Sequence, residues 1–258
     1  MQNNTFSTLF VGQNLIKLKE VDSTNNYLKN LASNSEPLPE GTVIMADNQF
    51  AGRGQQESVW QTEAGKNIST SIYLKPSFLA IKKQFYLNIA VSLAVADALS
   101  YFLPLAVAVK WPNDIYYNRK KLGGILIENS LTGTTIKSAV IGIGLNINQQ
   151  VFKSDLAEKA TSVFQILHKE LDLELVMEKI FVYIEKYYLN LKSEKYSILH
   201  SNYLKKLLYF DLEANYIHNG QVFEGKIKGV EESGYLIMEV DNQIKNFNFK
   251  EIEYIHTN

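Results

Sequence analysis

The chain has 258 residues, of which 46% are hydrophobic and 21% are charged. This composition is typical of a globular protein, and the length suffices for one large and one small domain. The formal net charge of -1 gives no overall attraction for nucleic acid or for an anionic membrane. The chain has no cysteine, which excludes a disulfide, a thiolate metal site and a thiol nucleophile, and which suits a reducing, cytoplasmic location.

Predicted elements in the first third of the chain surround a polar loop. Residues 22–25 have side chains that suit a helix N-cap, and they precede a helical pattern that ends near Ala32. A buried strand is predicted at 41–46 and another strand at 67–74. Loops longer than about 12 to 15 residues usually have a function, so the intervening loop at 49–66 is a candidate site.

The middle of the chain predicts one helix followed by strands. Apolar residues recur at helical spacing over 83–103, and a strand is predicted over 106–110. Two further strands, 121–128 and 138–145, are joined by a hairpin-type connection. We expect no membrane span in this apolar stretch, because Asp97 lies near its centre and a central charge costs about 3 kcal/mol on insertion.

The last part of the chain predicts a helix and then a small β-barrel. Apolar residues mark one face of an amphipathic helix over 172–192. Beyond Tyr203 the pattern changes to short alternating segments, separated by residue pairs that are typical of hairpin turns. These segments lie at 207–216, 221–230, 235–240 and 243–249. We therefore divide the chain into a large domain, residues 1–205, and a small β-domain, residues 206–258.

Two glycine-containing motifs indicate an anion site. Arg53 lies between two glycines, which let backbone amides approach an anion closely, and its guanidinium matches carboxylate or phosphate oxygens. Lys121 precedes Gly123 and Gly124 in a predicted strand, where glycine is unfavourable unless a ligand or another backbone comes close. The alternatives are an ordinary flexible loop and a strand bulge with solvated lysines.

The segment Lys-Trp-Pro-Asn-Asp at 110–114 ends a predicted strand and directs Lys110, Asn113 and Asp114 towards one rim of the sheet. Mg²⁺ commonly takes one or two carboxylates together with substrate phosphates, so we expect phosphate-bound Mg²⁺ near Asp114. The alternative is a turn with a surface Lys–Asp pair. We expect no metal site built from a side-chain cluster, because the four histidines have no ligand spacing.

Two other groups of side chains suit a small polar ligand. Ser23, Thr24 and Asn25 have donors and acceptors for a polar ring system, although helix capping alone also explains them. Asn146 follows the strand Ile-Gly-Ile-Gly-Leu, and its amide can pair with an adenine edge. Strand termination is the commoner use of such an asparagine.

In this order, the motifs resemble those of the biotin–protein ligases, also called biotin–[acetyl-CoA-carboxylase] ligases or holocarboxylase synthetases. The resemblance is close from about 21 to 147 and looser at 160–163 and in the terminal β-domain. The matching residues are Asp22 to Asn25, Gln49, Gly52 to Gly54, Trp60, Lys110 to Asp114, Lys121 to Gly124 and Gly142 to Asn146.

The resemblance implies an α+β fold with a central mixed β-sheet, flanking helices and a C-terminal SH3-like β-barrel. It implies an enzyme that uses ATP and Mg²⁺ to activate biotin as biotinyl-5′-AMP. The biotinyl group then passes to a lysine of a biotin carboxyl carrier protein or of the carrier domain of a biotin-dependent carboxylase. An exposed sheet edge would also support a homodimer, which the sequence leaves open.

The resemblance further implies roles for individual residues. The expected catalytic residues are Arg53, Lys110, Asp114 and Lys121. The expected nucleotide-binding residues are Trp60, Asn113 and Asn146. The expected biotin-binding residues are Ser23, Thr24, Asn25, Gln49, Arg53, Gly54, Gln55, Lys121, Gly123 and Gly124.

Two departures from the family pattern carry predictions. Many bacterial members have Gly-Arg-Gly-Arg, whereas this chain has Gln55 in place of the second arginine. A neutral amide binds the adenylate less strongly than a guanidinium, so we expect biotinyl-5′-AMP to escape more readily. Only about twenty residues precede Val21, too few for a helix-turn-helix, so we expect a ligase without DNA binding or transcriptional repressor activity.

Three rival functions stand beside this interpretation. A lipoate–protein ligase shares the fold and the acyl-adenylate chemistry, although the glycine motifs fit the biotin pattern better. A non-catalytic biotin sensor would release no pyrophosphate from ATP. A nucleic-acid-binding module built on the terminal barrel ranks last, because that segment has no dense row of Lys and Arg.

Overall fold

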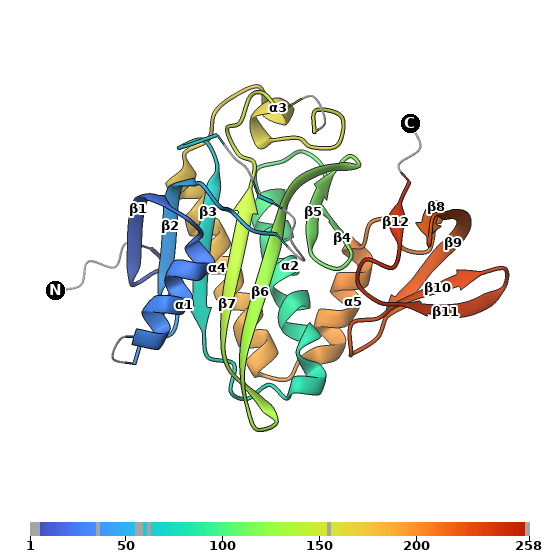
Figure 1. Cartoon of the computed structure of the whole chain (residues 1–258), viewed down its shortest axis with the longest axis horizontal. Coiled ribbons are helices and arrows are strands. Elements are labelled where there is room, and N and C mark those ends of the chain that lie inside the picture. Colours follow the sequence, from blue (N-terminus) through green and yellow to red (C-terminus); the bar gives the residue numbers. More distant parts are fainter. Residues whose placement is uncertain (1–5, 35–36, 55–58, 61–62, 154–155, 256–258) are drawn as a thin grey trace.

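The computed structural model describes residues 6–34, 37–54, 59–60, 63–153 and 156–255. In this part of the chain, two β-sheets lie side by side and helices cover the larger one (Figure 1). Gln55, one of the predicted site residues, lies outside the described residues.

The larger sheet contains seven strands in the order β1-β2-β3-β7-β6-β5-β4. β1 and β2 are parallel, and the other neighbouring strands are antiparallel, so the predicted mixed sheet is confirmed. The strands are β1 (Leu15–Val21), β2 (Val43–Gln49), β3 (Ile68–Leu74), β4 (Ala108–Lys110), β5 (Asp114–Tyr117), β6 (Lys120–Thr132) and β7 (Thr135–Leu145).

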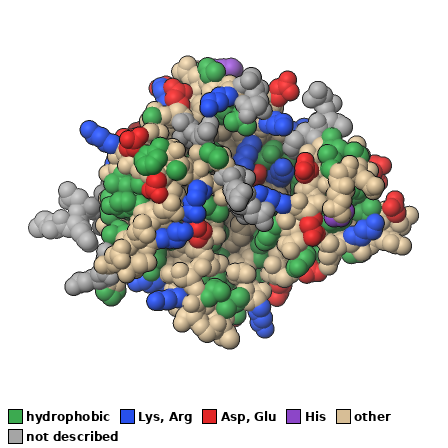
Figure 2. Space-filling model, viewed as in Figure 1, with side chains coloured by type: hydrophobic (Ala, Val, Ile, Leu, Met, Phe, Trp, Pro, Cys, Tyr) green, Lys and Arg blue, Asp and Glu red, His purple; other side chains and the backbone are tan. Residues whose placement is uncertain are grey.

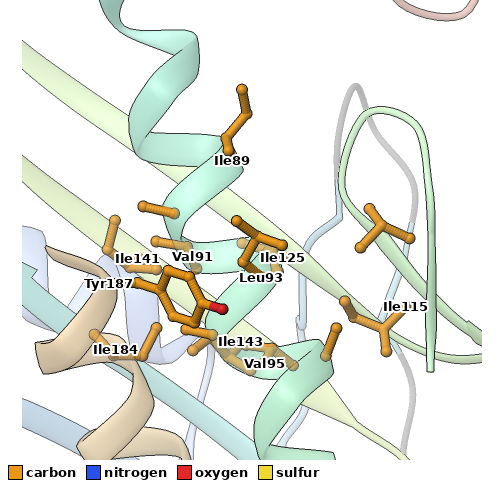
Figure 3. Close-up of a cluster of buried hydrophobic side chains, with 14 of the residues drawn as sticks. Ile89, Val91, Leu93, Val95, Ile115, Ile125, Ile141, Ile143, Ile184 and Tyr187 are labelled. Carbon is orange, nitrogen blue, oxygen red and sulfur yellow. The ribbon is translucent and has the colours of Figure 1, made fainter. Parts of the chain in front are cut away.

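Helices lie on both faces of this sheet. α1 (Thr24–Asn34) packs on one face against β2, β3 and β7, while α2 (Phe85–Ser100), α4 (Leu173–Lys192) and α5 (Tyr196–Lys206) lie on the other (Figure 1). α2 is buried on nearly every side because apolar residues occupy most of its positions. Figure 3 shows its side chains in the apolar core with those of the sheet and α4. Among the described helices, none is long and apolar enough to cross a membrane.

Two short helices complete the large unit. η1 (Ile81–Lys83) is a single turn of 3-10 helix before α2, and α3 (Val163–Leu167) follows the residues that lead out of β7. Ser162 caps α3, because its hydroxyl accepts a hydrogen bond from the backbone N–H of Gln165 at 3.1 Å.

The second sheet is antiparallel, with five strands in the order β11-β10-β9-β8-β12, which agrees with the predicted SH3-like unit. Its strands are β8 (Glu213–His218), β9 (Gln221–Val230), β10 (Leu236–Val240), β11 (Gln243–Phe247) and β12 (Glu253–Tyr254). One apolar core includes side chains of both sheets. Trp111 Nε1 also donates a hydrogen bond to Gly234 O at 3.0 Å, which joins the second sheet to the 110–114 segment.

Six elements escaped the sequence-based prediction: β1, β5, η1, α3, α5 and β12. In addition, the strand predicted at 207–216 begins only at Glu213. Tyr209 and Asp211 have φ angles of 63° and 56°, which are incompatible with extended backbone, so the chain turns here before it enters β8. The division of the chain at 205 and 206 stays a prediction.

Candidate active site

A cavity of about 880 Å³ lies over the large sheet and beside the second one. It is lined by α1, the loop after β2, strands of the large sheet and residues 250–254. Seven Lys and Arg side chains but only three Asp and Glu side chains are among the described lining residues. Figure 2 shows Lys and Arg side chains gathered around the hollow. A chain of net charge -1 therefore concentrates positive charge at one place, as an anion site requires.

One end of the cavity contains a hydrogen-bond network. The backbone N–H and the hydroxyl of Thr24 donate to Gln49 Oε1 at 2.8 Å and 3.1 Å. Ser71 Oγ lies 2.7 Å from Thr24 Oγ1 and 2.6 Å from Asn25 Oδ1. Thr24, Asn25 and Ser71 are all buried, so these donors and acceptors are held in fixed directions. Such an arrangement suits a small polar ring.

Asn25 lies on a glycine of the sheet. Ser71, Gly142 and Leu126 are neighbours across β3, β7 and β6. A Cβ atom at Gly142 would lie 2.5 Å from Asn25 Oδ1, so only glycine leaves the room that Asn25 occupies. From there Asn25 contacts both adjacent strands, through Ser71 on β3 and through Glu128 on β6, whose Oε2 accepts from Asn25 Nδ2 at 2.8 Å.

Trp60 occupies the next glycine position on β7. A Cβ atom at Gly144 would lie 2.5 Å from Trp60 Cε2, so the indole ring rests directly on the strand. Among the described residues, Trp60 Nε1 is buried without a hydrogen-bond partner. The ring thus offers the cavity an aromatic wall that is suited to stacking.

The turn after β4 is fastened by hydrogen bonds from several elements. Pro112 O accepts from Asn88 Nδ2 of α2 at 2.7 Å and from the Tyr203 hydroxyl of α5 at 2.8 Å. Asn113 Nδ2 donates to Ile125 O, and Ile125 N donates to Asn113 O at 3.2 Å. These bonds fix the backbone between Lys110 and Asp114, and with it the two charged side chains at its ends.

Charged groups meet at this turn. Lys121 Nζ lies 2.6 Å from Asp114 Oδ1. Burial lowers the pKa of the Lys110 ammonium, although Asp114 and Glu253 act in the opposite direction. Lys110 Nζ also lies 4.9 Å from the ring centre of Tyr254, whose hydroxyl is buried without a partner among the described residues. The second sheet thus takes part in the site.

Most of the predicted site residues lie together. Those that line the cavity are Ser23, Thr24, Asn25, Gln49, Arg53, Gly54, Trp60, Lys110, Asn113, Asp114, Lys121 and Gly124. Gly123 and Asn146 are not among the lining residues. A Cβ atom at Gly123 would lie 2.2 Å from Gly144 O, so this glycine permits close strand packing. Asn146 Nδ2 donates to Thr161 O at 3.1 Å. The ligand roles of all these residues, lining or not, stay predictions.

The residues near the site that sequence reasoning missed include Ser71, Glu128 and Tyr254. Ser71 ends three consecutive hydroxyl residues in a fully buried strand, a pattern that signals buried hydrogen bonding. Glu128 follows an apolar run, and an acid there signals a partner of opposite charge. Tyr254 had no local signal, because only the packing of the second sheet brings it to the cavity.

Comparison with known proteins shows the family of the chain. Residues 18–146, half of the chain, match the model of the biotin/lipoate A/B protein ligase family. The bifunctional ligase/repressor BirA of Bacillus spizizenii is 32% identical over 248 residues, which are 95% of this chain and 75% of that protein. The chain therefore belongs to the biotin/lipoate A/B protein ligase family.

Its similarities within that family are to biotin ligases. The biotin–[acetyl-CoA-carboxylase] ligase of Paracoccus denitrificans is 36% identical over 132 residues, 50% of this chain and 53% of that protein. The biotin protein ligase of Aquifex aeolicus, solved with biotin and ATP, has a TM-score of 0.79 and 28% identity over 95% of this chain and 99% of that chain. The predicted resemblance to biotin–protein ligases, which are enzymes, is confirmed.

Proposed function

We propose that this ligase activates biotin with ATP as biotinyl-5′-AMP and then biotinylates a lysine of a biotin carboxyl carrier protein. The observation that carries the proposal is that one cavity combines a fixed hydrogen-bond network, an excess of cationic side chains and an indole wall. The Aquifex aeolicus protein, whose structure contains biotin and ATP, supports the choice of substrates.

In the first step, the biotin carboxylate attacks the α-phosphate of ATP and pyrophosphate leaves. Carboxylate and phosphate repel each other by about 4 kcal/mol at 4 Å and an effective dielectric constant of 20. Arg53, Lys110 and Lys121, which all line the cavity, offset this repulsion and stabilise the charge that develops on the α-phosphate.

In the second step, the neutral ε-amine of the carrier lysine attacks the acyl carbon and AMP leaves with the phosphate oxygen. Asp114 is the carboxylate beside the cationic groups, and we assign it to orient the amine. No covalent enzyme intermediate is required, which agrees with a chain that has no cysteine.

The remaining cavity residues divide between the two substrates. We assign Ser23, Thr24, Asn25 and Gln49 to the polar ring of biotin, and Gly54, Gln55, Gly123 and Gly124 to its tail and the acyl phosphate. Trp60 stacks on adenine, with Asn113 and Asn146 assigned to the nucleotide. For Asn113 and Asn146 this role requires that the amide exchange a backbone hydrogen bond for one to the ligand, since each is bonded to a carbonyl.

Mg²⁺ belongs to the proposal as the partner of ATP. The described residues contain no group of three or more His, Cys, Asp or Glu side chains that would hold a metal by themselves. Asp114 fits the usual arrangement, in which Mg²⁺ takes one or two carboxylates and completes its shell with phosphates and water. Bound there, the ion would neutralise charge on the triphosphate.

The proposal extends to the setting of the reaction. We place the enzyme in the cytoplasm, since the chain has no cysteine that would need an oxidising compartment. β1 is an edge strand of the large sheet, and we propose that such an edge supports a homodimer, which sedimentation would measure. Repressor activity is not part of the proposal, because the net charge of -1 gives no general affinity for DNA, and a mobility-shift assay tests this.

Mass spectrometry of a carrier domain tests the function. The domain is incubated with the ligase, ATP, Mg²⁺ and biotin, and a parallel reaction contains lipoate. We expect the mass of the carrier domain to increase in the biotin reaction and not in the lipoate reaction. With Arg53→Ala or Lys121→Ala, we expect no increase in either reaction. An increase only with lipoate would retain the chemistry and replace the substrate. No increase and no pyrophosphate release would support a non-catalytic biotin sensor instead.

A further inference from the structure

Glu128, which is outside the set of residues assigned to substrates, accepts hydrogen bonds from three side chains. Its carboxylate accepts from Asn25 Nδ2 at 2.8 Å and from Lys29 Nζ at 2.7 Å. Arg53 Nη2 lies 3.2 Å and 3.1 Å from the two carboxylate oxygens. One side chain of β6 thus connects α1 with the loop that follows β2.

The carboxylate is ionised in this environment. Burial alone raises the pKa of Glu128, but hydrogen bonds from Lys29 and Asn25 and the charges of Lys29 and Arg53 outweigh it, so the pKa lies below its ordinary value. The Glu128 side chain is 25% exposed and that of Arg53 is 41% exposed, so solvent screens their contact in part.

The contact with Glu128 leaves Arg53 able to bind a ligand. A guanidinium has five N–H donors in a planar fork. The hydrogen bonds of its side chain within the described residues use only Nη2, so Nη1 and Nε remain available on a residue that lines the cavity. Without an anchor, the long arginine side chain would lose more conformational entropy on binding.

Glu128 also fixes the orientation of Asn25, which belongs to the hydrogen-bond network of the cavity. Asn25 Nδ2 is bonded to Glu128, and Asn25 Oδ1 is close to Ser71 Oγ, so the orientation of the amide is determined at both ends. If the Asn25 amide turned by 180°, its NH₂ group would face Ser71 Oγ in place of Oδ1. Glu128 therefore determines which Asn25 atom is paired with β3.

We propose that Glu128 is a positioning residue that orders Arg53 and Asn25 together before the substrate binds, and so couples recognition of the carboxylate tail to recognition of the polar head. This inference rests on the proposed function. The substrate class that it favours is a small molecule with a hydrogen-bonding ring at one end and a carboxylate at the other, in which both ends are needed for affinity.

Isothermal titration of biotin in the absence of ATP tests the inference with three variants. We expect Glu128→Ala to weaken binding about tenfold or more, because both Arg53 and Asn25 lose their anchor. Glu128→Gln retains an acceptor for Asn25 and should lose about three- to tenfold. Lys29→Met is the matched control: Lys29 contacts Glu128 but does not line the cavity, and binding should stay within about twofold of wild type.

Kinetics separate positioning from general damage. In a pyrophosphate-release assay, the KM for biotin should rise in Glu128→Ala while the KM for ATP, measured at saturating biotin, is unchanged. Unchanged biotin affinity in Glu128→Ala, or an equal loss of affinity for both substrates, overturns the inference. If Glu128→Ala unfolds, Glu128→Gln decides by the same criteria. A wild-type protein that binds no biotin refutes the proposed function instead.

Discussion

At the residue scale, the three cationic side chains proposed to act in the site differ in their ion-pair partners. Lys121 is paired with Asp114 at 2.6 Å, and Arg53 is paired with Glu128. Lys110 has no salt bridge within 4.0 Å among the described residues, and burial lowers its pKa. Lys110 therefore loses its positive charge at a lower pH than an ordinary lysine.

This difference predicts a pH dependence. If the reaction needs the positive charge of Lys110, its rate falls as the pH rises through a pKa below the ordinary lysine value. Lys110→Arg should keep activity to higher pH, because a guanidinium stays protonated throughout. The measurement is kcat for pyrophosphate release as a function of pH. Lys82→Arg, at an exposed lysine outside the cavity, should leave the profile unchanged. Identical profiles for Lys110→Arg and wild type would contradict the assignment.

A second residue-scale prediction concerns Gln55. The family pattern has an arginine here in many bacterial members, and a guanidinium forms a charge-assisted bond that an amide cannot form. We expect Gln55→Arg to reduce labelling of non-cognate lysines several-fold, as measured by mass spectrometry of a bystander protein. The carrier domain, biotinylated in the same tube, is the internal control. Equal bystander labelling by wild type and variant would refute adenylate leakage through this position.

At the element scale, two alternate glycines of β7 make room for two side chains that we propose to bind the substrates. Gly142 makes room for Asn25 and Gly144 for Trp60. Gly142→Ala should therefore raise the KM for biotin, and Gly144→Ala the KM for ATP, each about tenfold or more, because backbone atoms of a central strand cannot move away. Gly229→Ala is the control, since a Cβ atom there meets only an ordinary contact at 3.6 Å. Equal effects of both variants on both substrates would contradict the assignment.

The strands of the large sheet differ in how far the sequence predicts them. β2, β6 and β7 were predictable because each contains an apolar run bounded by polar residues, and β3 because its side chains alternate weakly between apolar and polar. β1 was missed although Ile16 to Lys19 alternate apolar and basic residues, as an edge strand does. The motifs clustered as expected because they lie at strand ends. Glu128 was not predictable as an anchor, since its partners come from α1 and a loop that only the folded sheet brings near.

At the scale of the whole molecule, Gly234 holds the second sheet against the 110–114 segment. Gly234 has a φ angle of 102°, and a Cβ atom there would lie 2.8 Å from Phe85 Cδ2. Its carbonyl accepts the Trp111 hydrogen bond. Both the backbone conformation and the space therefore require glycine.

Gly234→Ala should destabilise the protein by about 1 to 3 kcal/mol through backbone strain and the clash with Phe85. We expect a lower Tm in calorimetry. We also expect a higher KM for ATP, because Trp111 loses its hydrogen bond to Gly234 O and the 110–114 segment, which includes Asn113, is held less firmly. Gly133→Ala is the matched control: its φ angle is also positive, at 55°, but no atom lies within 4 Å of the added methyl group. If both variants melt alike, the contact between the second sheet and α2 contributes nothing to stability.

The lining of the cavity extends along almost the whole described chain, from Ser23 to Tyr254. A site assembled from such distant segments exists only in the native state, so each substrate acts thermodynamically as a ligand of folding. At a free concentration one hundred times its dissociation constant, a ligand that binds only the native protein adds about 2.7 kcal/mol to the free energy of unfolding. Scarcity of biotin would then expose more of the enzyme to proteolysis, and the cellular amount of the ligase would follow the supply of its own substrate.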